Sequence, residues 1–376
     1  MKYQICSRCI MDTSDPEIQF DADGVCNHCH KYDSRSAVEL KHGAAGQREL
    51  SELVERIKAD GKGKQYDCVI GVSGGVDSTM VAYKVKQLGL RPLAIHFDNG
   101  WNSELAVSNI EKTLRKLDID LYTYVVDWNE FRDIQLSFIK AGVANIEAPT
   151  DHAIGALLYK MAAKHGLKYL ISGGNLETEG VMPTSWLYDN KDWKHIRGLH
   201  RLFGKVKLKT FPHYGLMHMV YYVFFRRIKF VKVLNYAPYN KSEAMELFRK
   251  EFDWVPYSGK HYESVFTKFY QAFILPNKFG YDKRRPHLSS LILSGQLLRD
   301  EALREVDLPL YRADELARDK EYILKKFGLS ESEFDKMMAE RPHSYRDYPS
   351  NKWIFENLNK GILGMVKRFA AGQRAN

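Results

Sequence analysis

The chain has 376 residues, of which 44% are hydrophobic and 27% are charged. This balance is usual for soluble globular proteins and excludes a disordered or fibrous chain. At roughly 150 residues per domain, the length predicts two or three domains. No apolar run reaches the roughly 20 residues of a membrane-spanning helix, and the N-terminus lacks an apolar signal core. We therefore expect a cytoplasmic protein with no stable membrane insertion.

The net charge of +9 is concentrated in one stretch. Residues 191–232 hold 11 Lys and Arg against one Asp, which gives a local charge of +10. Such a patch suits phosphate-bearing ligands, an acidic partner or an anionic membrane face. It indicates nucleic acid less strongly than a basic charge spread through the whole chain, and we expect no nucleic-acid partner. Residues 186–232 are either a mobile or partner-docking insertion or a patch that presents cations to the phosphates of the substrate.

Four of the five cysteines lie in the first 29 residues. The two Cys-x2-Cys pairs, 16 residues apart, match the spacing of zinc sites built from two knuckles. Such pairs place thiolates at neighbouring corners of a tetrahedron, which predicts a closed structural Zn²⁺ site. The alternatives are disulfides, which a cytoplasmic setting disfavours, an iron–sulfur cluster, or replacement of one thiolate by His28 or His30. The predicted ligands are Cys6, Cys9, Cys26 and Cys29.

A glycine-containing loop follows a short apolar run. Residues 66–72 read as a buried strand, and Val81, Val85 and Leu88 recur at helical spacing after it. Glycine N–H groups, a helix N-terminus and serine hydroxyls together make a pyrophosphate cradle. The string is not a Walker A loop, which needs Gly-Lys-Ser/Thr, nor a dinucleotide fingerprint. It runs Ser73-Gly74-Gly75-Val76-Asp77-Ser78.

Asp77 needs a partner in that setting, because a carboxylate repels phosphates. Either it binds a Mg²⁺ ion that bridges to ATP, or it caps the following helix. Glu177 and Glu179 could complete a Mg²⁺ site with Asp77; otherwise they are solvated loop carboxylates. Cys68 lies inside the strand and is expected to be buried.

Strands and helices alternate up to residue 172. Strands are expected over 93–97, 121–126 and 169–172, and helices up to 117 and from Thr150 or Asp151, as the cap, to 165. This alternation predicts an α/β fold with a doubly wound parallel sheet. Ligands of such sheets bind at the carboxyl ends of strands. Three such ends carry glycine: residues 71–78, 98–100 and 173–175.

The second half carries weaker signals. Residues 231–234 read as a further strand, and Asn240 begins a capping box that places Lys241 in the first turn of a helix. Lys241 either reaches the triphosphate or is solvated. Residues 259–287 are rich in cations and aromatic rings, which suit a sugar nucleotide, or else form a charged helix face. The substrate candidates are His261, Glu263, Lys268, Lys283, Arg284, Arg285 and His287. The apolar side of residues 353–369 is expected to pack on the core or a partner.

The Ser-Gly-Gly-x-Asp-Ser string after a strand resembles the PP-loop of the N-type ATP pyrophosphatases. The Cys-x-x-Cys-Ile-Met-Asp-Thr-Ser-Asp-Pro-Glu-Ile opening, residues 20–29, this loop and residues 259–291 together resemble the N-acetyl sugar amidotransferases. These are the WbpG and PseA-like enzymes of bacterial surface polysaccharide (LPS O-antigen) biosynthesis. The resemblance covers most of the chain.

The resemblance implies a sheet of the PP-loop ATP pyrophosphatase (HUP-like) type. It also implies the organisation of the chain: a zinc ribbon over 1–35, a helical linker over 36–65, the ATP pyrophosphatase domain over 66–250 and a helical substrate- or partner-binding region over 251–376. Catalytic roles fall on Ser73, Asp77 and Lys241. ATP binding falls on Gly71, Ser73, Gly74, Gly75, Asp77, Ser78, Phe97, Asp98, Gly173 and Gly174.

The activity implied is a ligase reaction on a nucleotide-linked N-acetyl sugar, commonly a UDP sugar. ATP with Mg²⁺ adenylates the acetamido oxygen, and ammonia displaces AMP to give an acetamidino sugar. The zinc knuckles and Cys68 account for all five cysteines, so no glutaminase is expected within the chain. The ammonia is expected from a separate glutaminase and a barrel subunit resembling those of imidazole-glycerol-phosphate synthase. The alternatives are a thiolase-like PP-loop enzyme that modifies tRNA, disfavoured by the missing catalytic cysteines, and an assembly subunit that only binds ATP.

Overall fold

A five-stranded parallel sheet forms the centre of the protein, in a computed structural model that describes residues 2–257 and 262–354. Its order is β3-β2-β1-β4-β5. The chain lays down β1, β2 and β3 on one side and then crosses to β4 and β5 on the other, so the sheet is doubly wound, as predicted. The strands are β1 (Cys68–Gly71), β2 (Pro92–Asp98), β3 (Asp120–Val125), β4 (Tyr169–Ser172) and β5 (Lys229–Lys232).

Alternate residues of the central strands pack in two separate hydrophobic cores, one on each face of the sheet, because successive side chains of a strand point to opposite faces. On one face, Val69 and Leu170 pack with helices α5 (Trp128–Ala141) and α6 (Ala148–Lys164). On the other face, Ile70 and Ile171 pack with the helices that precede and follow the glycine loop. These are α2 (Gly43–Gly61), α3 (Val76–Gln87), α4 (Glu104–Lys116) and α10 (Lys241–Phe252).

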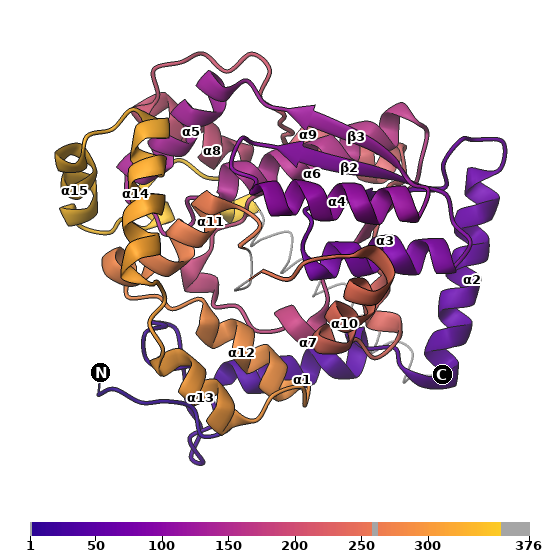
Figure 1. Ribbon diagram of the computed structural model, residues 1–376, viewed down its shortest axis with the longest axis horizontal. Helices are drawn as coiled ribbons and strands as arrows, with labels where there is room; N and C mark the ends of the chain where they lie inside the picture. Colours follow the sequence, from indigo (N-terminus) through magenta and orange to yellow (C-terminus); the bar gives the residue numbers. More distant parts are fainter. Residues whose placement is uncertain (1, 258–261, 355–376) are drawn as a thin grey trace.

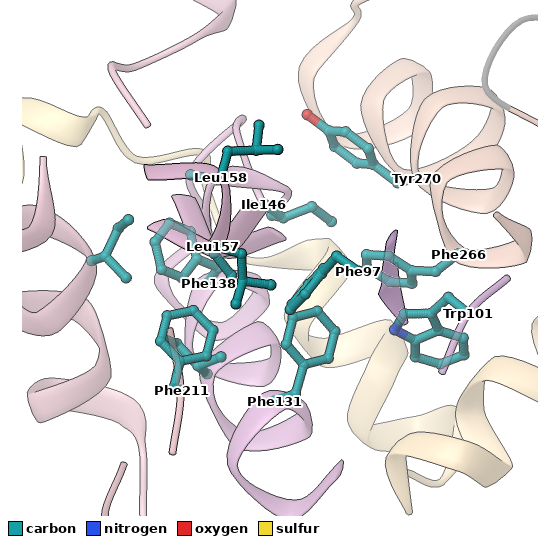
Figure 2. Close-up of a cluster of buried hydrophobic side chains, with 14 of the residues drawn as sticks. Phe97, Trp101, Phe131, Phe138, Ile146, Leu157, Leu158, Phe211, Phe266 and Tyr270 are labelled. Atoms are coloured by element: carbon teal, nitrogen blue, oxygen red, sulfur yellow. The ribbon is translucent and has the colours of Figure 1, made fainter. Parts of the chain in front are cut away.

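The region after residue 250 shares the first of these cores. Trp101 follows β2 and stacks on Phe266, with ring centroids 5.2 Å apart. Figure 2 shows these two rings beside Phe97 and Phe131, which meet edge to face. The helices that follow therefore close over the α/β domain. They are α11 (Val265–Phe269), the π-helix Tyr270–Phe279, α12 (Arg284–Leu293), α13 (Arg299–Asp307), α14 (Ala313–Phe327), α15 (Glu331–Ala339) and the 3₁₀ turn Tyr345–Asp347.

The N-terminal cysteine segment packs against the strand-end side of the domain. Its hairpin pairs Phe20 with Cys26, and α1 (Asn27–Glu39) begins directly after it and continues past the predicted boundary at residue 35. The cysteine core buries Leu176 and Trp186. These belong to α7 (Leu176–Glu179) and the 3₁₀ turn Thr184–Trp186. In Figure 1, α1 lies beside α7, and α7 in turn packs against α12.

The basic stretch forms α8 (Trp193–Phe203), α9 (Leu216–Val220), the π-helix Tyr221–Phe225 and β5. The strand expected at 231–234 lies at 229–232 and ends in the 3₁₀ turn Val233–Tyr236. The capping prediction at Thr150 or Asp151 is wrong. Helix α6 begins at Ala148, because Pro149 occupies the first turn, where a missing N–H costs no hydrogen bond. None of the described helices is long and apolar enough to cross a membrane.

Candidate functional site

The four predicted zinc ligands converge. All four thiols are buried and lie within 4.8 Å of one another. The Sγ atoms of Cys6 and Cys29 are 3.8 Å apart, those of Cys9 and Cys26 3.6 Å, and those of Cys26 and Cys29 3.7 Å. These separations are too long for disulfides. A tetrahedral Zn²⁺ ion with bonds of about 2.3 Å needs sulfurs about 3.8 Å apart, so the cluster fits a zinc ribbon.

The two neighbouring histidines have other partners. His28 Nε2 lies 2.7 Å from Asp15 Oδ2, and His30 Nε2 lies 2.8 Å from Asp21 Oδ2. Among the described residues, the cysteine group is the only set of three or more candidate ligands that gathers in this way. Replacement of a thiolate by His28 or His30 is therefore not supported.

The glycine loop joins β1 to α3 at the carboxyl edge of the sheet. Gly75 precedes the helix as its N-cap, so the backbone of the first turn points its N–H groups toward the loop. Ser73 Oγ and Ser78 Oγ lie 3.2 Å apart, and the Gly75 N–H donates to Ser73 Oγ at 3.3 Å. Hydroxyls and backbone donors thus converge where an anion would sit.

Gly74 needs to be glycine for two reasons. Its φ of +83° lies in the left-handed region, and a Cβ there would come within 2.8 Å of the Ala106 carbonyl oxygen. Its own carbonyl accepts hydrogen bonds from Trp254 Nε1 at 3.2 Å and from the Tyr257 hydroxyl at 3.0 Å. These two aromatic residues follow α10, and no motif in the sequence marks them as part of the site.

Asp77 does not cap α3, because it lies inside the helix, one residue after Val76. Its Oδ1 accepts a hydrogen bond of 2.7 Å from the Tyr239 hydroxyl, and Asn175 Nδ2 lies at 3.5 Å. Asn175 follows β4, so this contact spans the point where the sheet order reverses between β1 and β4. That crevice is where open α/β sheets bind their ligands.

Glu177 and Glu179 lie around Tyr239 without forming a compact site with Asp77. Glu177 is buried, and its Oε2 accepts a 2.7 Å hydrogen bond from the Tyr239 backbone N–H. Glu179 is exposed. Burial raises the pKa of Glu177. The three carboxylates do not gather into one three-ligand group. The Mg²⁺ site therefore stays a prediction, with Asp77 at the loop as its best-placed member.

The remaining predicted ATP residues lie at the same edge. Gly173 approaches α3 so closely that a Cβ would lie 3.1 Å from the Asp77 carbonyl, and the Gly174 N–H donates to Ser172 Oγ at 3.0 Å. Asp98 Oδ1 accepts from the Gly100 N–H at 2.9 Å. The Phe97 side chain lies in the core, so only its backbone faces this edge. Gly71 ends β1.

Glu263 lies at the loop. A Cβ built on Gly75 would come within 2.0 Å of Glu263 Oε1, so a carboxylate oxygen occupies the space over the cradle. The negative charge of Glu263 adds to the effect of burial in raising the pKa of Tyr257. His287 lies near the same edge, because its Nδ1 contacts the Thr178 carbonyl at 3.2 Å. His261 lies outside the described residues.

The charge of Lys283 acts on two acidic residues, Glu147 and Asp151, that were not predicted to be site residues. Burial raises the pKa of Glu147 to about 8 and that of Asp151 to about 6, and the positive charge of Lys283 opposes both shifts. Asp151 is nevertheless exposed, and the negative charge of Glu179 also contributes to raising its pKa. Carboxyl groups with pKa values near neutrality suit proton transfer.

Three predicted substrate cations hold the fold together. Lys268 Nζ pairs with Glu315 at 2.9 Å and with Asp319 at 3.1 Å. Arg284 pairs with Asp282 and donates to carbonyls at the end of α13. Arg285 pairs with Asp12 and donates to the Ile10 carbonyl, which joins α12 to the cysteine segment. Their contact with a substrate diphosphate stays a prediction.

Lys241 begins α10, which Asn240 caps as predicted. Its backbone N–H donates to Gln296 Oε1 at 3.1 Å, and its charge opposes the burial that raises the pKa of Glu305. A cavity of about 270 Å³, lined in part by Met80 and Tyr239, lies between α3 and α10. A reach from Lys241 to the triphosphate stays a prediction.

Residues 263–360 match the family model described as LPS biosynthesis protein WbpG-like, C-terminal domain. The match confirms the resemblance to the WbpG-like proteins over that segment, which begins at the glutamate over the loop. A search of curated proteins found no match.

The solved structures that resemble this one include three synthetases of nicotinamide nucleotides. NMN synthetase from Francisella tularensis is 15% identical, with 75% of this chain and 96% of that chain covered and a TM-score of 0.33. NH3-dependent NAD synthetase from Campylobacter jejuni is 18% identical, with 42% and 73% covered and a TM-score of 0.29. Glutamine-dependent NAD+ synthetase from Acinetobacter baumannii, in complex with ADP, is 15% identical, with 80% and 49% covered and a TM-score of 0.34. Similarity at this level does not bear on function.

Proposed function

We propose that this protein is an ATP-dependent amidotransferase that converts the acetamido group of a nucleotide-linked N-acetyl sugar into an acetamidino group. The observation that carries the proposal is the junction of two parts. The glycine loop, which we propose as the pyrophosphate cradle, lies at the switch point of the sheet, and Oε1 of Glu263, the first residue of the WbpG-like segment, lies close to Gly75 of that loop. ATP bound at the cradle would thus be next to the part of the chain that resembles sugar amidotransferases.

In the proposed reaction the acetamido oxygen attacks the α-phosphorus of ATP, and pyrophosphate leaves into the cradle. The N–H groups around Gly75 and the hydroxyls of Ser73 and Ser78 stabilise the departing charge. A bound Mg²⁺ ion would offset phosphate charge, and Asp77 is the carboxylate best placed to hold it. Ammonia then adds to the activated carbon, AMP leaves, and a carboxylate such as Asp151 takes the released proton.

The ammonia source belongs to the proposal as well. We expect a separate glutaminase and a barrel subunit to deliver ammonia, as the resemblance to the sugar amidotransferases implies. None of the five cysteines is placed as a glutaminase nucleophile, because Cys68 is buried in β1 and the other four gather in the candidate metal site. Burial raises the pKa of the Cys68 thiol, which makes it a poor nucleophile.

The test is release of pyrophosphate from Mg-ATP in the presence of ammonium chloride. A panel of UDP- and CMP-linked N-acetyl sugars is compared with bulk tRNA. Release that depends on one sugar, with a product whose mass shows oxygen replaced by an NH group, supports the proposal. Release that depends only on tRNA overturns it in favour of an RNA-modifying enzyme.

A further inference from the structure

An apolar helical segment stands out from the basic stretch. It comprises α9 and the π-helix that continues it, residues 216–225, and none of its residues is buried. Met217 is 78% exposed, Phe224 73% and Phe225 75%. Single exposed apolar residues are ordinary, but a continuous exposed group of this size marks an interaction site.

The segment is attached firmly, so its exposure is part of the fold. Tyr222 stacks on Tyr159 of α6, with ring centroids 5.2 Å apart. At its start, Tyr214 stacks on His152 at 4.4 Å. At its end, Arg226 donates to the Ala163 carbonyl at 2.7 Å. One edge of the helix is therefore held against α6 while the rest faces outward.

The stretch of chain that carries this segment is strongly positive. No Asp or Glu occurs between residues 193 and 232. Two buried acids on α5 do approach the stretch, but their oxygens accept backbone N–H groups and pair with one histidine. Asp133 binds Lys205, Val206 and His200, and Glu130 binds the N–H groups of residues 209–211. The exposed side chains of Arg227 and Lys229 follow the helix.

We propose that residues 216–225 rest on an anionic lipid surface, with the apolar side chains among the acyl chains and the cations on the headgroup phosphates. Aromatic and apolar residues beside several Lys and Arg are the composition of helices that lie in a membrane interface. The exposed apolar residues do not lie along one narrow stripe of the helix, because they occupy positions 220, 221, 223, 224 and 225. A groove on a protein would cover one stripe, whereas lipid can cover several sides of a helix.

Other occupants fit less well. A symmetric contact with a second copy would bring two strongly positive surfaces together, which costs energy. Protein interfaces generally match both signs of charge, and the stretch that carries this segment, residues 193–232, contains no acidic residue. The contact would be peripheral, since none of the described helices can span a membrane.

The proposal is tested by flotation of the full-length protein with vesicles of phosphatidylglycerol and phosphatidylcholine, against vesicles of phosphatidylcholine alone. We expect binding only to the anionic vesicles, weakened by salt. The double variant Phe224→Ser/Phe225→Ser should bind on the order of tenfold more weakly, and so should Arg227→Ala/Lys229→Ala. Leu298→Ser/Leu308→Ser removes two equally exposed leucines elsewhere and should bind as the parent protein does.

Two outcomes overturn the proposal. One is the absence of binding to anionic vesicles at low salt, or binding that the Phe224/Phe225 variant retains in full. The other is evidence for a protein contact from a parent protein that binds no vesicles. Such evidence would be a molar mass that increases with concentration in light scattering, or capture of a glutaminase partner, provided that the Phe224/Phe225 variant abolishes it. Those results would assign the segment to a protein contact.

Discussion

The hydroxyl of Tyr239 donates a 2.7 Å hydrogen bond to Asp77 Oδ1, while its backbone N–H donates a 2.7 Å hydrogen bond to Glu177 Oε2. Asp77 follows β1 and Glu177 follows β4, so one tyrosine links carboxylates from both sides of the switch point. Burial, followed by the charge of Asp77, raises the pKa of this tyrosine far above its ordinary value. The hydroxyl is therefore a permanent donor that holds the Asp77 carboxylate in one orientation.

Replacing Asp77 with asparagine should abolish pyrophosphate release without unfolding the protein. The amide keeps the shape of the side chain but removes the charge that would hold Mg²⁺ at the cradle, and we expect a loss on the order of 100- to 1000-fold. The rate is measured over a range of Mg²⁺ concentrations, together with the melting temperature. Glu246→Gln changes an exposed acid on α10 and serves as control. Full activity of Asp77→Asn would refute the metal role.

The carboxylate over the loop leads to a prediction about ATP affinity. Glu263 Oε1 occupies the space above Gly75, where a phosphate would repel it. Glu263→Gln should therefore bind ATP more tightly in the absence of Mg²⁺, by about fivefold for the loss of one like-charge contact near the surface. Isothermal titration with and without Mg²⁺ measures the effect. Weaker binding by the variant, seen only when Mg²⁺ is present, would show instead that Glu263 helps to hold the metal.

The zinc ribbon should be needed for the packing of Trp186. That indole is 1% exposed and belongs to the same buried cluster as the four cysteines. Chelation of the metal, or Cys9→Ser, should expose it and shift its fluorescence to longer wavelength, because structural zinc sites contribute folding energy directly. Cys68→Ala removes the only cysteine outside the cluster and should keep one zinc per chain. Iron in place of zinc in elemental analysis would contradict the prediction.

The sequence predicts features whose signals are local. The Ser73–Ser78 string, the strands around it and the cysteine spacing each fit within a few dozen residues, and all are confirmed in the fold. Tyr239 was not predictable in this way, because its partner Asp77 is 162 residues distant and the contact depends on the turn after β5.

The role of the cations in residues 259–287 was not predictable from the sequence for a related reason. A charged residue in a sequence does not reveal its partner, and Arg284 and Arg285 are used to join α12 to α13 and to the cysteine segment.

The pKa of Asp151 predicts how the ammonia-dependent rate responds to pH. Burial raises this pKa to about 6. A base acts in its ionised form, so its contribution should be present above about pH 6 and fall as the pH decreases through that value. Asp151→Asn should be slower than the parent protein at neutral pH, and the difference should shrink below pH 6. The ratio of the two rates cancels the titration of ammonia itself. A ratio that does not change with pH would exclude Asp151 as the proton acceptor.

Asp133 should stabilise the basic stretch by binding its backbone. Although burial pushes the pKa of Asp133 upward, the N–H groups of Val206 and Lys205 and the ring of His200 bring it below its ordinary value. A carboxyl group with a lowered pKa stabilises the fold above its unfolded pKa of about 3.9, and this contribution is lost as the pH falls through the lower folded value.

Asp133→Asn should lower the free energy of unfolding by about 1.5–3 kcal/mol, as expected for the loss of hydrogen bonds to a charged group. The measurement is urea unfolding at pH 7 and at acid pH. Glu111→Gln, on the exposed face of α4, should change little. Equal stability of Asp133→Asn and the parent protein at pH 7 would show that the hydrogen bonds to the Asp133 carboxylate do not stabilise the fold.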